Sequence, residues 1–248
     1  MQQYFVKKPF SNPVTIEDKD TRKHMFQVMR LKENDQVQLV FEEGDKYLAK
    51  VMDPEAGTLT IGEALDQDVE LPVAVTIASA FPKGDKLEFL AQKTTELGAS
   101  ALWSFPGDWS VVKWDGKKLA KKTEKLEKIL QGAAEQSKRN HLPQVQLFEK
   151  KADFLALLPR FDHILLAYEE TAKTGEKKSL LSALESIQAG DKVLCIFGPE
   201  GGLSPQEVSS FQAAGAHLLG LGPRILRAET APLYLLSAIS VKLELEAD

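Results

Sequence analysis

The sequence predicts an α/β fold in which a small β-rich unit precedes a larger unit built on a parallel sheet. Up to about residue 70, short runs alternate apolar and polar residues between turn sequences. From Val73 onward, near-continuous apolar runs alternate with helix-like segments, a pattern typical of a parallel sheet covered by helices. Late in the chain a glycine-rich turn follows one apolar run, and open α/β sheets bind ligands at such turns.

The first unit is predicted to contain one helix, at 17–31, and three strands. The strands are expected at 36–41, 46–52 and 58–63. Turn sequences separate them, at Glu43-Gly44-Asp45 and Pro54-Glu55-Ala56-Gly57. Because these connections are too short for parallel crossovers, we expect a small barrel-like β unit.

The pattern changes around Pro72, so we place the domains at 1–71 and 72–248. In the second domain strands are expected at 73–78, 101–105, 163–168, 192–197 and 217–221. Helices are expected at 86–97, 117–138, 205–214 and 232–246. The closing helix is apolar nearly all round, which favours burial on two sides and a dimer interface.

Composition favours a soluble globular protein, because the 248 residues are 43% hydrophobic and 27% charged, and a single cysteine, which excludes an internal disulfide framework, fits the reducing cytoplasm best. No apolar run is long enough to span a membrane, and the amino terminus has no signal-peptide core, so no membrane partner is expected. Cys195 is the only cysteine and lies in an apolar strand, where we expect an inert core thiol. The four histidines lack the spacing of metal ligands, and no metal is predicted.

The net charge of −5 is unevenly distributed along the chain. Residues 1–72 carry nine basic and fourteen acidic side chains, whereas residues 113–139 carry nine basic and four acidic ones. The basic stretch is a candidate RNA footprint, although a solvated helix face is the more common origin of such a pattern.

The glycine-rich turn at 198–202 is the most informative stretch. Three glycines in five residues let the backbone approach a ligand closely and adopt positive φ angles. Ser204 is in position to cap the next helix, with Pro205 at its first position and Glu207 at its third, as in a capping box. The turn therefore has the features of a ligand site at the end of a buried strand.

The residues of this turn also indicate which ligands it excludes. No Gly-Lys-Ser/Thr follows, so it is not a P-loop, and its late position does not fit a dinucleotide fingerprint. Glu200 lies inside the turn, and its carboxylate would repel a phosphate. A cationic or zwitterionic ligand fits better.

A second glycine turn, at 220–223, follows one helix and one strand later. Four polar residues then precede the closing helix: Arg224, Arg227, Glu229 and Thr230. A turn and a helix cap would explain Thr230. They do not explain two arginines next to Ile225 and Leu226, where we expect poor solvation and costly burial of charge.

The motif GPEGGLSPQE at 198–207, followed by LGPRILRAETAPL at 221–233, resembles the RsmE family. These bacterial enzymes of the SPOUT superfamily methylate N3 of a uridine in 16S ribosomal RNA. The resemblance extends over the whole chain, through the opening MQxYFV, KTTELG at 93–98 and AAEQSKR at 133–139.

The resemblance implies a SPOUT methyltransferase domain with a C-terminal trefoil knot, preceded by a PUA-like RNA-binding β-barrel domain. S-adenosylmethionine would be the cofactor. The residues implied to hold it are Leu166, Ala167, Phe197, Gly198, Pro199, Glu200, Gly201, Gly202, Leu221, Gly222, Arg224, Ile225 and Leu226. The implied partners are the small ribosomal subunit with its 16S RNA and a second copy of the chain, and no DNA.

Within the resemblance, the target is a uridine of the decoding region, position 1498 in the usual numbering. The catalytic candidates are Arg227, Glu229 and Thr230. Deprotonating N3 requires a base or a cation that stabilises the developing anion, and we assign these roles to Glu229 and Arg227. Capping the last helix is an equally good role for Glu229. The RNA-binding candidates are His24, Arg30, Lys83, Lys93, Gln136 and Arg139.

Two positions depart from the family pattern. Trp109 stands where an arginine is usual before Ser-Val, and Ala228 replaces a threonine. For Trp109, as for Trp103 and Trp114, packing in the core or at an interface is favoured over stacking on a base.

Three alternatives stay open from the sequence. The chain can be a methyltransferase of the same fold that acts on another RNA, such as a tRNA, or a non-catalytic RNA- or ribosome-binding protein. An unrelated α/β enzyme that binds a nucleotide at the same turn is the third, which the absence of a phosphate-loop lysine disfavours.

Overall fold

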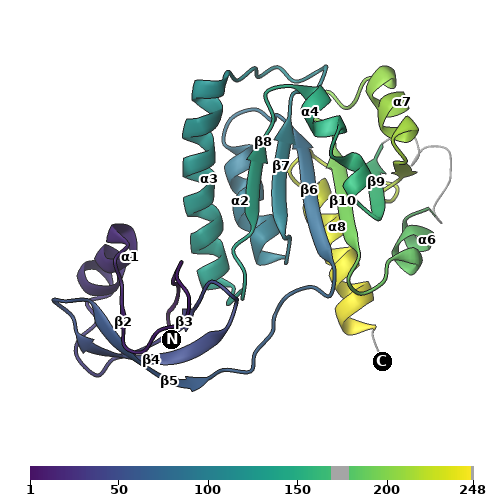
Figure 1. The fold of residues 1–248 in the computed structure, drawn as a ribbon. Helices are drawn as coiled ribbons and strands as arrows, with labels where there is room; N and C mark the ends of the chain where they lie inside the picture. The colour runs from purple at the N-terminus through teal and green to yellow at the C-terminus, as the bar shows by residue number, and fades with distance from the viewer. Residues whose placement is uncertain (169–178, 247–248) are drawn as a thin grey trace. The chain divides into compact units, whose positions relative to one another are not determined.

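The computed structural model describes residues 1–168 and 179–246, which form two compact units (Figure 1). Unit 1 comprises Met1–Glu70 and a later segment, Ala134–Leu142. Unit 2 comprises Leu71–Ala133 and the chain from Pro143 onward. Among the helices that the structure describes, none combines the length and the apolar character needed to cross a bilayer.

Unit 1 is a five-stranded sheet with a short helical segment. In the order in which they pair, its strands are β1 (Gln3–Phe5), β3 (Gln36–Val40), β4 (Lys46–Asp53), β5 (Thr58–Ala64) and β2 (Val14–Thr15). The helical segment is α1 (Lys19–Lys23) followed by the π-helical turn η1 (His24–Val28). The predicted helix and three strands are confirmed to within three residues. β1 and β2 escaped prediction because two or three residues are too few to show a period of two.

One strand pair of unit 1 contradicts the expectation that parallel crossovers do not fit. β1 pairs with β3 in parallel, whereas the other pairs are antiparallel. The chain between Phe5 and Gln36 includes β2 and α1, and it is therefore long enough to return in the same direction.

Unit 2 contains the predicted parallel sheet. Its strands are β6 (Ala74–Ala80), β7 (Ala101–Phe105), β8 (Gln144–Leu147), β9 (His163–Ala167), β10 (Lys192–Phe197) and β11 (His217–Leu219). They pair in the order β11-β9-β10-β6-β7-β8, and every pair is parallel. β8 was not predicted because it lacks buried side chains and therefore a clear apolar pattern.

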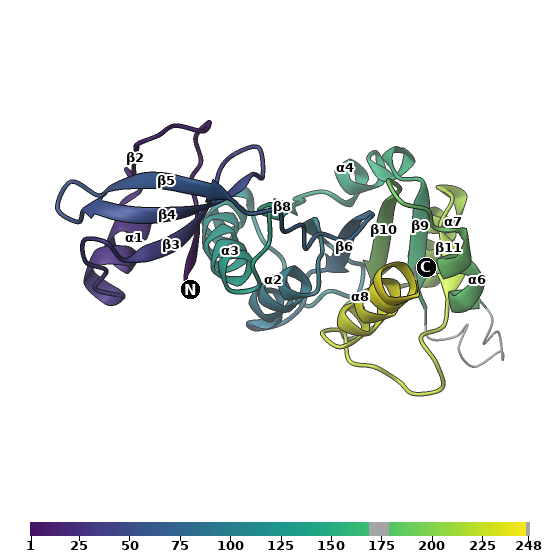
Figure 2. The ribbon, with the colours of Figure 1, turned by 90° about the horizontal axis from the view of Figure 1, so that it is seen from below.

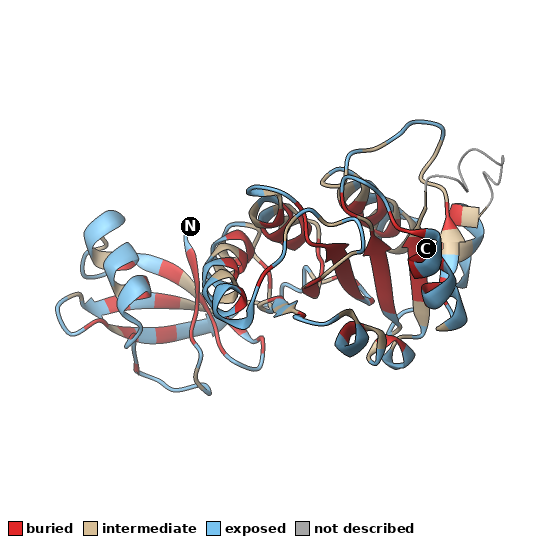
Figure 3. Cartoon of the chain, turned by 90° about the horizontal axis from the view of Figure 1, so that it is seen from above, coloured by how far each residue is buried: buried red, intermediate tan, exposed pale blue. Residues whose placement is uncertain are grey.

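Helices cover both faces of this sheet (Figure 2). One face packs against α2 (Lys86–Glu96), α3 (Gly116–Gln136), α6 (Ser179–Ser186) and α8 (Ala231–Ser240), which η3 (Val241–Leu245) continues. The other packs against α4 (Lys151–Leu155), η2 (Leu158–Arg160) and α7 (Pro205–Ala213). Along β10, Val193 and Cys195 face the first layer and Leu194 and Ile196 the second, so the central strands are buried throughout (Figure 3).

The strand order creates a switch point between β6 and β10. From β6 the chain adds β7 and β8 towards one edge of the sheet, whereas β9 and β11 lie on the opposite side of β10. The loops at the carboxyl ends of the strands therefore diverge at this point. Open α/β sheets bind ligands in the crevice that results.

Candidate active site

A cavity of about 630 Å³ opens at the carboxyl ends of the strands of unit 2. Its walls are formed by the loops after β9, β10 and β11, together with Lys86 after β6 and Trp109 after β7. Its volume lies within the roughly 300–1,000 Å³ of small-molecule sites. The cavity is thus at the position that the topology favours for a ligand.

The first glycine turn, residues 198–202, forms one wall of this cavity. A Cβ atom on Gly198 would lie 3.0 Å from the carbonyl carbon of Gly202 and 3.0 Å from Cγ of Leu203, so a larger residue does not fit there. Gly202 has a φ of +78°, and its N–H donates to the carbonyl of Pro199 at 2.8 Å. The positive φ of Gly202 therefore favours glycine, and the close approach of the chain at Gly198 disfavours a side chain there.

The helix after this turn begins with the predicted capping box. The Glu207 N–H donates to Ser204 Oγ at 3.1 Å, and the Ser204 N–H donates to Glu207 Oε2 at 2.9 Å. Glu207 is buried, and its other oxygen accepts from the Asp108 N–H at 2.9 Å and from Lys151 Nζ at 2.6 Å. The box thereby ties the glycine turn to the loop after β7.

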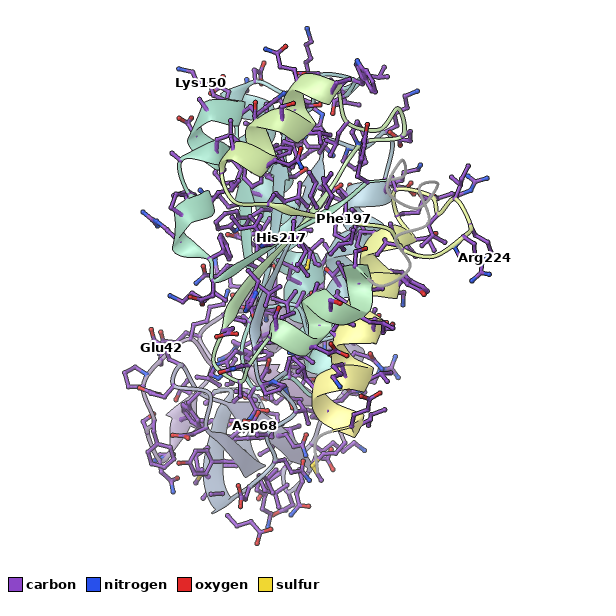
Figure 4. All side chains as sticks on the ribbon, turned by 90° about the vertical axis from the view of Figure 1, so that its right-hand side faces the viewer. Glu42, Asp68, Lys150, Phe197, His217 and Arg224 are labelled. Carbon is purple, nitrogen blue, oxygen red and sulfur yellow. The ribbon has the colours of Figure 1, made fainter. Side chains whose placement is uncertain are left out.

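The second glycine turn is far more open. Gly222 has a φ of +93°, and Arg224, Ile225 and Arg227 all line the cavity while remaining exposed. Arg224 extends away from the body of unit 2 (Figure 4). The expectation of poorly solvated arginines was therefore wrong, because Ile225 itself is 76% exposed and forms no apolar enclosure around them.

An ion-pair bridge connects the two turns through Lys86, the first residue of α2. Its Nζ lies 3.0 Å from Glu200 Oε1 and 2.9 Å from Glu229 Oε2. The backbone N–H of Lys83 also donates to Glu200 Oε1, at 3.2 Å. The hydrogen bonds to Glu229 and Glu200 raise the pKa of Lys86, which is therefore a fixed positive charge between two carboxylates.

This bridge determines the protonation of Glu229. Burial raises the pKa of its carboxyl group, but the hydrogen bond from Lys86 and other favourable contacts outweigh burial, and the pKa is lowered. Glu229 is thus ionised at neutral pH, as a proton acceptor must be, yet a lowered pKa makes it a weak base. Thr230 occupies the N-cap position of α8 without a side-chain capping hydrogen bond.

The cavity collects nearly all of the residues predicted to hold the cofactor. Twelve of the thirteen line it, as does Arg227. The exception is Leu166, whose side chain is fully buried in the core while Ala167, at the end of the same strand, lines the cavity. Glu229 contacts the site through Lys86.

The predicted RNA-binding residues are distributed over both units. His24, Arg30 and Gln136 are exposed in unit 1, and Lys83 is exposed in unit 2. Lys93, half-buried on α2, pairs with Glu96 at 2.8 Å. These five stay predictions.

Arg139 is the exception among these candidates, because it is a structural residue of unit 1. Only 3% of it is exposed, and its Nε lies 2.9 and 2.8 Å from the two carboxylate oxygens of Glu70. Burial raises the pKa of Glu70, but Arg139 and two backbone N–H groups outweigh it and lower the pKa. The structure therefore contradicts the predicted contact of Arg139 with RNA.

Eight residues of the cavity were not among the predicted site residues, and three of these eight have a polar or aromatic side chain: Lys86, Trp109 and Tyr168. Each follows a strand of the parallel sheet, and position at a strand's carboxyl end was the available signal. Trp109 is 50% exposed, so of the two predicted kinds of packing the core is excluded for it, and packing at an interface stays a prediction. Core packing holds for Trp114, against Phe81, and for Trp103, against Phe148.

Two further kinds of site, a reactive thiol and a metal centre, are not found among the residues that the structure describes. Cys195 is fully buried, and burial strongly raises the pKa of its thiol, which confirms an inert core residue. Within residues 1–168 and 179–246, no group of His, Cys, Asp and Glu side chains is arranged to hold a metal ion.

The fold and the cavity together define an RNA methyltransferase: the chain matches the RNA methyltransferase domain over residues 69–240 and the RNA methyltransferase PUA domain over residues 16–63. It belongs to the family of ribosomal RNA small subunit methyltransferase E, the RsmE family. The Bacillus subtilis member is 44% identical over 225 residues, which cover 90% of this chain and 88% of that protein.

Solved structures agree with this membership. A crystal structure of a hypothetical protein is 38% identical and superposes with a TM-score of 0.91 over 99% of this chain and 100% of its own. A methyltransferase from Legionella pneumophila, in complex with bound S-adenosylmethionine, is 25% identical with a TM-score of 0.81 over 96% of each chain. The predicted family and fold class are thereby confirmed, whereas the trefoil knot stays a prediction.

Proposed function

We propose that this chain transfers a methyl group from S-adenosylmethionine to N3 of a uridine in 16S RNA of the small ribosomal subunit, the decoding-region uridine that the family resemblance implies. Family membership supports the enzyme class, the cofactor and the RNA. One observation carries the rest: both glycine turns and Arg227 line a single cavity.

The residues of the cavity fit S-adenosylmethionine. Gly198, Gly201 and Gly202 present backbone without side chains to the cavity, and the volume of about 630 Å³ suits a ligand of this size. Exposed arginines and ionised carboxylates on opposite turns suit a ligand that carries both signs of charge. Ala167, Phe197, the two turns and Leu226 would hold it, and its sulfonium supplies a methyl group that needs little further activation.

The chain's own residues must then manage the proton of uracil N3. Arg227 is exposed to the cavity and is proposed to stabilise the negative charge that develops on the carbonyl oxygens beside N3. Glu229 is the proposed proton acceptor. Because its pKa is lowered, it depends on the acidification of N3 by Arg227.

A second copy of the chain is proposed to complete the enzyme. The helix α8 and its surroundings expose large apolar side chains although Leu235, Leu236 and Ile239 fill the core. The exposed set comprises Tyr234, Val241, Leu245 and Ile225. Such a face is typical of a homodimer interface, and sedimentation of the purified protein as a monomer would contradict it.

RNA contacts are proposed for the exposed candidates His24, Arg30, Lys83 and Gln136, with Lys93, and a cytoplasmic location follows from this substrate. The test is methyl transfer to purified small subunits that lack the modification, with the product nucleoside identified by mass spectrometry. We expect N3-methyluridine at one position. Transfer only to tRNA, or no transfer despite S-adenosylmethionine binding, would overturn the proposal in favour of the other two functions.

A further inference from the structure

Trp109 differs from the other tryptophans in that it lines the cavity and is 50% exposed. Trp103 and Trp114 pack against phenylalanines, with ring centroids 5.4 Å from Phe148 and 4.4 Å from Phe81. Single exposed apolar residues are common and need no explanation by themselves. What distinguishes Trp109 is how firmly its backbone is held.

The residue before Trp109 is tied to the buried start of α7. Asp108 donates its N–H to Glu207 at 2.9 Å, and its carboxylate accepts from Ser204 Oγ at 2.5 Å. Lys151 bridges Asp108 and Glu207. Hydrogen bonds from Lys151 and Ser204 lower the pKa of Asp108, which keeps this network charged. The loop is therefore fixed in position before any ligand arrives.

The Trp109 side chain lies beside the first glycine turn. A Cβ atom on Gly201 would lie 3.4 Å from Cβ of Trp109, and one on Gly202 would lie 4.0 Å from its ring carbon Cζ3. Side chains at these two glycines would thus be in van der Waals contact with Trp109, which the bare turn leaves half exposed. Its exposed surface faces the same cavity as Arg227.

The strand order separates Trp109 from most of the residues that would hold the cofactor. Those residues follow β9, β10 and β11, whereas Trp109 follows β7, on the other side of β6. A flat ring presented at this end of the cavity suits a second flat ligand placed next to the cofactor. A nucleobase fits that description, since bases stack on aromatic side chains and are taken out of their RNA stack for chemistry.

We propose that Trp109 is the surface on which the target uracil stacks, next to the methyl donor and within reach of Arg227. This inference rests on the proposed function. It assigns Trp109 to the positioning of the substrate and not of the cofactor.

The test compares the full-length proteins Trp109→Ala and Trp109→Phe with the unsubstituted enzyme. Base–aromatic stacking predicts that Trp109→Ala lowers kcat/KM for unmethylated small subunits by about ten- to a hundred-fold. Its Kd for S-adenosylmethionine, measured by calorimetry, should stay within about threefold. Trp109→Phe should recover most of the loss. Phe89→Ala, which removes an aromatic residue 42% exposed on α2, is the matched control and should retain full activity.

Three results would overturn the inference. These are unchanged kcat/KM in Trp109→Ala, a loss confined to cofactor affinity, and a loss explained by dissociation of the dimer in sedimentation. If the unsubstituted protein itself fails to methylate the subunits, both the proposed function and the inference about Trp109 are contradicted. If the unsubstituted protein and Trp109→Ala both methylate them fully, only the inference about Trp109 is contradicted.

Discussion

The two glycine turns of unit 2 share one cavity but are stabilised in different ways. The first, at 198–202, has its path fixed by sterics at Gly198 and by the capping box of α7. The second, leading to Thr230, is exposed, has no side-chain cap at α8 and is joined to the first through Lys86. The difference indicates a division of labour: a preorganised cradle binds the ligand, and a looser segment carries the charges that act on the substrate.

Substitution of Gly198 should break the cradle and has the largest expected effect on cofactor binding. In Gly198→Ala the new methyl group meets backbone atoms at 3.0 Å, and overpacking of this kind costs about 1–3 kcal/mol. We expect loss of measurable S-adenosylmethionine binding in calorimetry and therefore of activity. The control is Gly132→Ala in α3, where a Cβ atom has no heavy atom within 4 Å. Retained binding in Gly198→Ala would show that the turn adapts.

Substitution of Arg227 should separate binding from chemistry. Arg227→Ala removes the proposed stabiliser of the uracil anion, for which a loss of about 10²–10³ in kcat is typical. Binding of S-adenosylmethionine should be mostly retained, the reverse of the Gly198→Ala result. Unchanged turnover with small subunits would eliminate this role of Arg227.

Removal of Lys86 should loosen the second turn and leave the first intact. Lys86→Ala abolishes two ion pairs in a partly exposed setting, worth about 1–2 kcal/mol together. We expect about tenfold weaker S-adenosylmethionine binding. Hydrogen exchange should become faster around residues 221–230 and stay slow at 198–204. Lys125→Ala breaks the exposed pair with Glu88 and serves as the control. Equal exchange rates in both variants would contradict the bridge.

Lowering the pH should have the smallest effect on cofactor affinity. Lys86 should determine the pH at which this affinity starts to fall. The pKa values of Glu200 and Glu229 are below their ordinary value of 4.5 in the folded chain, so their ion pairs are intact above that pH and are lost as the pH falls through the lowered values. Cofactor affinity should therefore hold down to about pH 4.5. In Lys86→Ala it should weaken at a higher pH, because the carboxylates lose the cation that lowers their pKa. The same onset in both proteins would exclude this linkage.

Much of the fold was predictable because unit 2 has buried strands with strong apolar patterns. The strands at 101–105 and 192–197 were predicted to the residue. Short strands such as β8 carry too few buried residues to be seen. The glycine turns were predictable since their backbone demands specific residue types, and Glu207 of the capping box sits at a fixed spacing from Ser204.

What the sequence could not predict depends on contacts between distant residues. The partners of Lys86 lie more than a hundred positions away, and no local pattern links them. Arginine is a residue type that often contacts RNA, but Arg139 is buried against Glu70. Only the folded chain reveals this contact. The exposure of Ile225 and Trp109 likewise depends on which elements the tertiary structure leaves uncovered.

The return of residues 134–142 to unit 1 has a consequence for biosynthesis. Glu70 receives its partner Arg139 only after the long helix α3 has been made, and Lys46 likewise waits for the carbonyl of Lys138, 2.8 Å from its Nζ. A nascent chain that has released only its first seventy residues from the ribosome thus lacks the segment that completes this unit. The amino-terminal unit can therefore finish folding only after residues 71–133 of unit 2 have been made, and synthesis of the two units is interleaved along the chain.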